Sequence, residues 1–224
     1  MNVLILRKLI IGATGLFLCI FLVVHLSANL VLLLPAEQAS HWYNAYAAFL
    51  ANNLLIKVVA YLLYASILLH ILYAFIILAK NRRARRVPYA VNRKLENSTW
   101  ASQNMGLLGV MILLFLVVHL ADFWAKAKLG IGGEVPLDAY GNKDLYILAE
   151  VLFDNLLYVT FYTLLMVPLG FHVFHGLKSA VKSLGLYHRK SLRRMERISL
   201  WFAWIVAGGF GIIPLIMYLK GLTL

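Results

Sequence analysis

The chain has 224 residues and a formal net charge of +12; 62% of its residues are hydrophobic and only 13% are charged. This composition excludes an ordinary soluble domain. Several apolar stretches reach the roughly 20 residues that a helix needs to cross a bilayer. We therefore predict an all-α integral membrane protein that forms a single domain over residues 1–224.

Five membrane-spanning helices are predicted from these apolar stretches. In chain order they cover Leu9–Leu34, Leu54–Leu78, Met105–Phe123, Ile147–Val181 and Ser199–Leu219. The first apolar run is too long for the core of a signal peptide, so we expect it to remain in the membrane. The fourth stretch exceeds the thickness of a bilayer and is expected to tilt or to continue as a cytoplasmic helix.

Most of the 21 Lys and Arg residues lie in three segments on one side of the predicted membrane. These segments precede the first span, connect the second span to the third, and precede the fifth span. The positive-inside rule then places the N-terminus in the cytoplasm and the C-terminus outside. Topology and contact with membrane lipids therefore explain the positive charge, and no nucleic-acid partner is predicted. Part of this basic face remains a candidate docking surface for a cytoplasmic partner.

The hexapeptide Phe-Leu-Val-Val-His-Leu occurs twice, in the first and third predicted spans. The glycines before it repeat as well, so both copies read GxxGxxxxxFLVVHL, with His25 in the first copy and His119 in the second. A histidine deep in a membrane helix is costly and is usually retained for a function. The duplication predicts that both histidines hold a metal centre between helices.

Cys19 is the only cysteine in the sequence. A single cysteine excludes an intramolecular disulfide, an iron–sulfur cluster held only by cysteines, and haem attached through a CxxCH motif. Any haem in this chain must therefore be bound non-covalently, through histidine.

Four histidines on the first four spans fall at two depths. His25 and His119 come late in spans that run outward, which places both toward the outer leaflet. His70 and His172 lie on spans that run inward, each ten residues before a lysine and thus about 15 Å from the basic boundary. Two bis-histidine haems stacked across the membrane require this arrangement. The outer iron would bind His25 and His119, and the inner iron would bind His70 and His172.

Two further features concern the inner pair. His175 competes with His172, because the two lie three residues apart and face nearly the same way, but equal depth with His70 favours His172. Gly15 and Gly109 lie ten residues inward of the repeated histidines, near the level of the inner pair. We expect these glycines to make room for a porphyrin, although ordinary packing of small residues is the alternative.

Quinone chemistry needs proton donors and acceptors near the edges of the bilayer. Candidates are Trp42, Tyr43 and Asp122 on the outer side, and Ser102 and Asn104 on the inner side. For the aromatic residues, an interfacial belt is the alternative. Asp122 is interpreted as a neighbour of a haem propionate, a proton relay or a simple span-end residue. The remaining histidines, His41 and His188, are predicted in loops.

Three segments extend the pattern of histidines: FLVVHLSANL, ASQNM…FLVVHLADFW and His172-Val-Phe-His175-Gly176. With them, the chain resembles, through nearly its whole length, the single-chain di-haem cytochrome b subunit of succinate:quinone oxidoreductases (succinate dehydrogenases) and quinol:fumarate reductases. The third segment is similar to the family's HxxxG motif, whose first histidine binds iron, and this assigns His172 rather than His175. Some fumarate reductases carry a glutamate nearby, where this chain has Leu169 and Gly170, which puts a proton path through that carboxylate in doubt.

The resemblance implies a membrane anchor and electron-transfer subunit with two haems b and no catalytic residue of its own. Succinate would be oxidised to fumarate on a cytoplasmic flavoprotein subunit, as in the tricarboxylic acid cycle. Electrons would pass through an iron–sulfur subunit docked on the basic face to the inner haem, the outer haem and a membrane quinone, with menaquinone implied. Two imidazoles per iron leave no open coordination site, which suits electron transfer. The implied location is the bacterial inner membrane.

Two other functions remain open. The first is the membrane cytochrome b subunit of another respiratory quinol oxidoreductase, such as nitrate reductase, whose N-terminus faces outward. The second is a haem-free proton-coupled transporter whose histidines relay protons. A topology reporter separates the first from our interpretation, and a haem spectrum separates the second.

Overall fold

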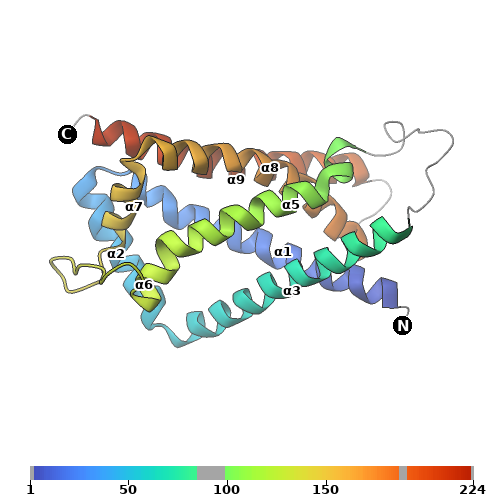
Figure 1. Cartoon of the computed structure of the whole chain (residues 1–224), viewed down its shortest axis with the longest axis horizontal. Helices are drawn as coiled ribbons and strands as arrows, with labels where there is room; N and C mark the ends of the chain where they lie inside the picture. The colour runs from blue at the N-terminus through green and yellow to red at the C-terminus, as the bar shows by residue number, and fades with distance from the viewer. Residues whose placement is uncertain (1–2, 85–98, 187–190, 223–224) are drawn as a thin grey trace.

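Five long helices run along the bundle in the computed structural model, which describes residues 3–84, 99–186 and 191–222 (Figure 1). They are α1 (Val3–Asn29), α3 (Leu54–Ala84), α5 (Trp100–His119), α8 (Leu156–Ser183) and α9 (Leu192–Gly221). Each belongs to a stretch that is long and apolar enough to cross a membrane. Helices make up 87% of the structure, and no β-strand occurs in the described ranges. The predicted all-α architecture with five membrane-spanning helices is confirmed.

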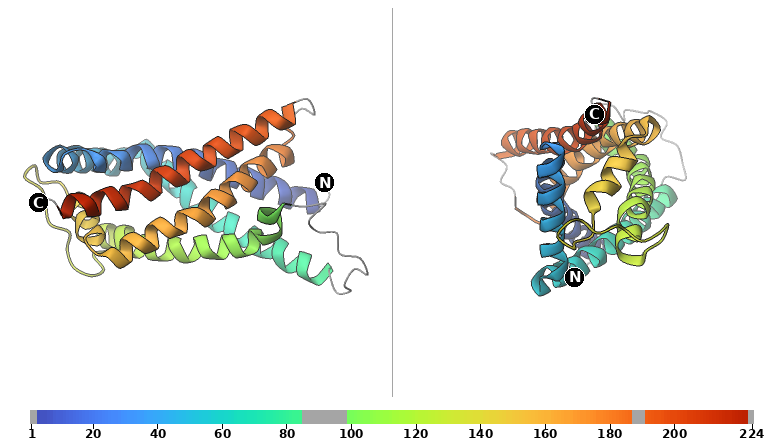
Figure 2. Two further views of the ribbon diagram at one scale, coloured as in Figure 1. Left: turned by 90° about the horizontal axis from the view of Figure 1, so that it is seen from above. Right: turned by 90° about the vertical axis from the view of Figure 1, so that its left-hand side faces the viewer.

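Short helical segments close one end of the bundle, which we term the capped end. They are η1 (Leu30–Leu33), α2 (Ala36–Asn52), η2 (Leu120–Ala125), α6 (Lys126–Leu129) and α7 (Leu145–Phe153). The right-hand view of Figure 2 looks onto this end, where α2 and α7 lie. The buried Asn44 side chain joins these two helices: Nδ2 donates to Asp144 Oδ1 (2.8 Å), and Oδ1 accepts from the backbone N–H groups of Leu145 and Tyr146.

For the fourth span, predicted as Ile147–Val181, the predicted beginning is wrong. Two polar residues, Asp154 and Asn155, interrupt the apolar stretch, so that α7 ends before them and α8 begins after them. The Asn155 side chain accepts a hydrogen bond from the Leu157 N–H (2.9 Å) and thereby caps α8. The extra length thus forms a separate helix at the capped end, and not a continuation beyond the other end of the span.

His41, predicted in a loop, lies instead on α2. This helix mixes polar and apolar residues, so a search for long apolar stretches does not detect it. The His41 ring packs against the rings of Trp42 and Tyr140 at the capped end. His188 lies outside the described residues.

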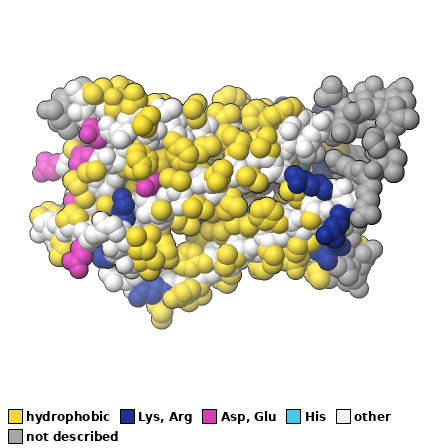
Figure 3. All heavy atoms as spheres, in the orientation of Figure 1, with side chains coloured by type: hydrophobic (Ala, Val, Ile, Leu, Met, Phe, Trp, Pro, Cys, Tyr) yellow, Lys and Arg dark blue, Asp and Glu magenta, His cyan; other side chains and the backbone are white. Residues whose placement is uncertain are grey.

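The long helices pack in a row, α3 against α1, α1 against α8 and α8 against α5, and α9 lies along α8. Within α3, no residue of the most apolar stretch is buried by the rest of the chain. Large apolar side chains cover the face of the bundle that Figure 3 shows. In water such a surface would be unfavourable, whereas in a bilayer it meets acyl chains. The chain is therefore a multi-pass membrane protein.

Acidic and basic side chains are distributed differently along the bundle in Figure 3. Asp and Glu in this view lie toward the capped end, whereas Lys and Arg occur at both ends; we term the end where α3 ends and α5 begins the basic end. The described basic residues at the basic end include Arg82 and Arg83 on α3, Lys182 on α8, and Arg193 and Arg194 on α9. Which end faces the cytoplasm stays a prediction from the positive-inside rule.

Candidate functional site

The outer histidines face each other across the bundle. His25 on α1 and His119 at the end of α5 have ring centres 5.8 Å apart, with the ring planes at 77°. Each ring stacks on the phenylalanine four residues before it: Phe21 on His25 (5.1 Å, 14°) and Phe115 on His119 (5.6 Å, 19°). The two copies of the sequence repeat therefore build two similar halves of one site.

The inner histidines also face each other. His70 on α3 and His172 on α8 have ring centres 6.3 Å apart, with the planes at 67°. The glycines of the repeat lie against these rings: a Cβ at Gly15 would lie 3.3 Å from His70 Cε1, and a Cβ at Gly109 would lie 3.8 Å from His172 Cε1. The absence of side chains at these glycines leaves room beside both rings. Gly176, one turn after His172, faces open space.

The two pairs lie at different levels of the bundle. Gly15 contacts the His70 ring, and His25 lies ten residues further along the same helix. At the rise of an α-helix, the pairs are separated by about 15 Å along α1. The structure thus brings the four histidines together two by two, on four different helices and at two levels.

The spacing within each pair suits one iron between two imidazoles. A metal–nitrogen bond of about 2 Å on each side, with the centre of each ring about 1 Å behind its nitrogen, puts the two ring centres about 6 Å apart. Both pairs have this spacing. The described residues contain no group of three or more His, Cys, Asp or Glu placed to hold a metal ion. A haem iron needs only two axial ligands from the protein, because the porphyrin supplies the others.

In each pair, one ring has a hydrogen-bonding neighbour at Nδ1 and the other has none among the described residues. Thr14 Oγ1 lies 3.2 Å from His70 Nδ1, and Asn29 Nδ2 lies 3.3 Å from His25 Nδ1. The Nδ1 atoms of the two facing histidines are buried without a partner. A buried polar atom without a partner costs free energy, so packing alone does not explain why these two rings are buried. Sequence reasoning identified neither Thr14 nor Asn29.

His175 lies one turn from His172 toward the basic end and is half-buried. Within the described ranges its ring makes no contact with the His70 ring, which faces His172. One turn further, the side chains of Lys178 and Glu196 form an ion pair between α8 and α9. The geometry therefore brings His172, and not His175, to His70. Which histidine binds a metal stays a prediction.

Tyr43 connects α2 to the outer pair. Its hydroxyl donates to Asn29 Oδ1 (3.4 Å), and Asn29 in turn contacts His25. Burial raises the pKa of Tyr43 to about 12, so near neutral pH it stays a neutral phenol that donates a hydrogen bond. Trp42 is exposed, and its ring packs against His41. Of the two quinone candidates on α2, only Tyr43 connects to one of the paired histidines, His25.

Asp122 lies in η2, a turn of π-helix that directly follows His119. Such turns occur frequently at functional sites. Asp122 Oδ2 accepts a hydrogen bond from Tyr162 Oη on α8 (2.8 Å), and the Tyr162 ring centre is 6.1 Å from that of His119. Tyr162 is buried, and sequence reasoning missed it because no motif marks it. A carboxylate and a phenol joined by a hydrogen bond therefore lie beside the outer pair.

Ser102 and Asn104 lie in the first turns of α5, at the basic end. The Ser102 N–H donates to Thr99 Oγ1 (3.3 Å), which caps the helix, and Asn104 Nδ2 donates to the Trp100 carbonyl oxygen (2.9 Å). These contacts are local to α5. The quinone candidates thus form two groups at opposite ends of the bundle and do not form one site.

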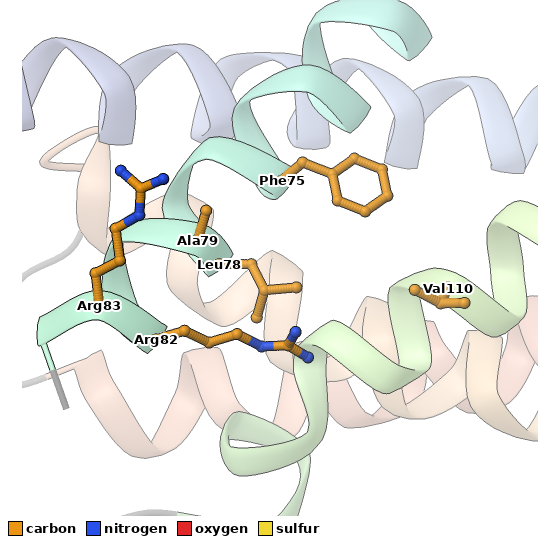
Figure 4. Close-up of a pocket in the computed structure, with 6 residues that line it drawn as sticks. All are labelled: Phe75, Leu78, Ala79, Arg82, Arg83 and Val110. Atoms are coloured by element: carbon orange, nitrogen blue, oxygen red, sulfur yellow. The ribbon is translucent and has the colours of Figure 1, made fainter. Parts of the chain in front are cut away.

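A groove of about 440 Å³ lies between α3 and α5 near the basic end (Figure 4). Its lining is apolar except at one end, and consists of Phe75, Leu78, Ala79, Val110, Arg82 and Arg83. In Figure 4 the Arg82 side chain extends from α3 toward α5. Val110 directly follows Gly109, so the groove begins near the level of the inner histidines. It suits a molecule with an apolar body and an anionic group.

Comparisons of the chain with protein-family models, with curated proteins and with solved structures find no match. A functional assignment therefore rests on the arrangement of the histidines, on the physical chemistry of their surroundings and on the sequence resemblance.

Proposed function

We propose that this chain is the membrane anchor and electron-transfer subunit of a succinate:quinone oxidoreductase or quinol:fumarate reductase, and that it binds two haems b. The observation that carries the proposal is the set of two histidine pairs, drawn from four helices and spaced as axial ligands of one iron each. The resemblance of the sequence to the di-haem cytochrome b family supports the identity of the cofactor.

His25 and His119 would hold the outer haem, and His70 and His172 the inner one. Haem supplies one-electron chemistry, and the protein supplies its binding, orientation and electrostatic surroundings. With two imidazoles bound to each iron, no coordination site would be left open, which would favour electron transfer over reaction with oxygen. Aromatic rings around the outer pair, among them Phe21, Phe115, Phe123 and Phe210, keep water from the imidazoles.

Under this proposal the quinone, menaquinone, meets the chain at the capped end. Tyr43 and the Tyr162–Asp122 pair lie beside the outer histidines, where a phenol and a carboxylate can donate and accept the protons that quinone chemistry requires. The exposed Trp42 lies on the same end, as an interfacial ring would. The candidates at the basic end, Ser102 and Asn104, lie at the opposite end of the bundle and therefore outside this quinone site.

The basic end would face the cytoplasm and receive the iron–sulfur subunit, which links the chain to the flavoprotein subunit. Arginines on α3 and α9 supply positive charge there, and an acidic surface on the partner would complement it. The inner histidine pair is the nearer one to this end, so electrons would enter at the inner haem. The proposed location is the bacterial inner membrane.

The haem content of the purified protein tests the proposal. We expect a pyridine haemochrome assay to give two haems b per chain, with a flavoprotein and an iron–sulfur protein copurifying. His25→Ala and His119→Ala should each remove one haem and leave the other. His41→Ala is the matched control, because its ring lies on α2 and outside both pairs, and it should keep both haems.

Absence of haem from the wild-type protein would contradict the proposal and favour the proton-coupled transporter. Two haems in a chain whose N-terminus faces outward would favour the nitrate reductase type of subunit. A reporter fused to the N-terminus distinguishes these outcomes.

A further inference from the structure

The two copies of the repeat differ at a position beside the inner histidines. The first copy begins Gly12-Ala13-Thr14-Gly15 and the second begins Gly106-Leu107-Leu108-Gly109. The last glycine of the first copy lies against the His70 ring, and that of the second copy lies against the His172 ring. Thr14 and its counterpart Leu108 therefore sit next to the residues that contact the two inner rings.

The hydroxyl of Thr14 lies within hydrogen-bond distance of two carbonyl oxygens of its own helix. Thr14 Oγ1 lies 2.8 Å from the carbonyl oxygen of Ile10 and 3.3 Å from that of Ile11. A carbonyl oxygen can only accept, and a hydroxyl has one hydrogen to donate. Whichever carbonyl receives it, the lone pairs of Oγ1 remain for the neighbour at 3.2 Å, which is His70 Nδ1.

This geometry favours one position for the proton on the His70 ring. With Thr14 Oγ1 as the acceptor, Nδ1 of His70 carries the N–H, and the backbone carbonyl oxygen of Ile11 is a second acceptor for the same ring. A neutral imidazole has one N–H, so Nε2 is left with a free lone pair. A metal ion binds that lone pair, and the hydrogen bond made by the other ring nitrogen sets which nitrogen is available.

The second copy of the repeat lacks this hydroxyl group. Leu108 is buried and has no polar atom in its side chain, and the Nδ1 atom of His172 is buried without a partner among the described residues. The Thr14-to-Leu108 difference thus coincides with a difference in the hydrogen bonding of the two inner rings. The first copy of the repeat therefore carries the hydroxyl group, and the second copy, which lacks it, serves as an internal control.

We propose that Thr14 is a positioning residue for the inner haem: its hydroxyl oxygen accepts the Nδ1–H of His70 and so presents the unprotonated Nε2 to the iron. This inference rests on the proposed function, because it assigns a partner to one of the proposed axial ligands. An acceptor at Nδ1–H also makes the imidazole a stronger electron donor, which stabilises ferric iron relative to ferrous iron. Removing the acceptor raises the midpoint potential of the inner haem.

Thr14→Val removes the hydroxyl with little change in shape, and Thr14→Ser keeps it. Loss of such an outer partner typically weakens binding about 10- to 100-fold. We expect Thr14→Val to lose the inner haem to a competing haem acceptor at least about tenfold faster than the wild type, and to raise the potential of whatever inner haem remains. Thr14→Ser should restore both values, while the outer haem stays unchanged. Wild-type loss rate and potential in Thr14→Val would overturn the proposal.

A second measurement is independent of haem. In haem-free protein, ¹⁵N chemical shifts of labelled histidines report which ring nitrogen is protonated. We expect His70 in the Nδ1–H form in the wild type and a shift toward the Nε2–H form in Thr14→Val. The Nε2–H form in the wild type would overturn the inference about Thr14, even if the protein binds two haems. Conversely, a wild type that never binds haem but shows the Nδ1–H form would contradict the proposed function and leave the hydrogen bond intact.

Leu108→Thr provides the reciprocal variant, because it places a hydroxyl at the corresponding position of the second copy. If the repeat operates as proposed, His172 gains an acceptor and its Nδ1–H form increases. No change in the His172 signals would contradict the equivalence of the two copies at this position. If Thr14→Val does not fold, the ¹⁵N shifts of His70 in the wild type still test the Thr14 contact.

Discussion

The outer histidine pair joins the two copies of the repeat to each other, whereas the inner pair joins α3 to α8, which lie outside the repeat. In the outer pair each ring stacks on a phenylalanine, so its two halves are alike. In the inner pair the halves differ, because Thr14 contacts His70 and His172 has no partner at Nδ1 among the described residues. One repeated sequence thus serves two sites, with its histidine at one level and its glycine at the other.

The surroundings of the two pairs predict different sensitivities. Bulky rings crowd the outer pair, and hydrogen-bonding side chains reach it from the capped end. Glycines border the inner pair, so added side-chain volume should disturb it most. Substituting a histidine of either pair should lower the haem content more than substituting a residue around that pair.

The largest effect is expected from removing an inner ligand. His172→Ala should remove one haem of two, because no other described ring faces His70. His175→Ala should keep both haems, because its ring lies outside the pair although it is only one turn away. Haem per chain, measured by the pyridine haemochrome assay, checks both. Loss of one haem in the His175 variant, with full occupancy in the His172 variant, would reverse the assignment.

A smaller effect is expected from substituting Gly15 or Gly109, and it should differ between the two copies of the repeat. A Cβ at Gly15 would lie 3.3 Å from His70 Cε1, closer than ordinary contact, whereas a Cβ at Gly109 would lie 3.8 Å from His172 Cε1. Gly15→Ala should therefore lower the occupancy of the inner haem, and Gly109→Ala should be tolerated. Gly208→Ala, where the new Cβ meets open space, is the control. Equal occupancy in all three variants would mean that the glycines only pack helices.

The architecture could be predicted from the sequence because helix length and helical rise depend on local pattern. Apolar stretches predicted the five long helices, and counting residues from the basic boundaries placed the four histidines at two levels. The break between α7 and α8 was missed, because a two-residue polar interruption is weak against a long apolar run. The contacts of Thr14 with His70 and of Tyr162 with Asp122 join residues 56 and 40 positions apart. Such contacts depend on how the helices rotate about their axes, which depth alone does not determine.

The smallest effect is expected from Tyr162→Phe, because Tyr162 touches the outer pair without being a ligand candidate. Its hydroxyl donates to Asp122 Oδ2 at 2.8 Å, and removing it leaves a half-buried carboxylate with one fewer donor. Loss of a buried hydrogen bond of this kind costs about 1–3 kcal/mol. The variant should therefore unfold at a lower temperature in detergent while retaining both haems.

Tyr158→Phe is the matched control, because this exposed tyrosine lies one turn earlier on α8 and makes no hydrogen bond within the described ranges. A double-mutant cycle with Asp122→Asn isolates the interaction between Tyr162 and Asp122. Equal thermal stability of the two phenylalanine variants would show that the pair contributes nothing to the fold. Loss of a haem in Tyr162→Phe would show instead that the hydroxyl, through its hydrogen bond to Asp122, holds the site at His119 in place, because the substitution removes one oxygen atom and leaves the packing between the two rings intact.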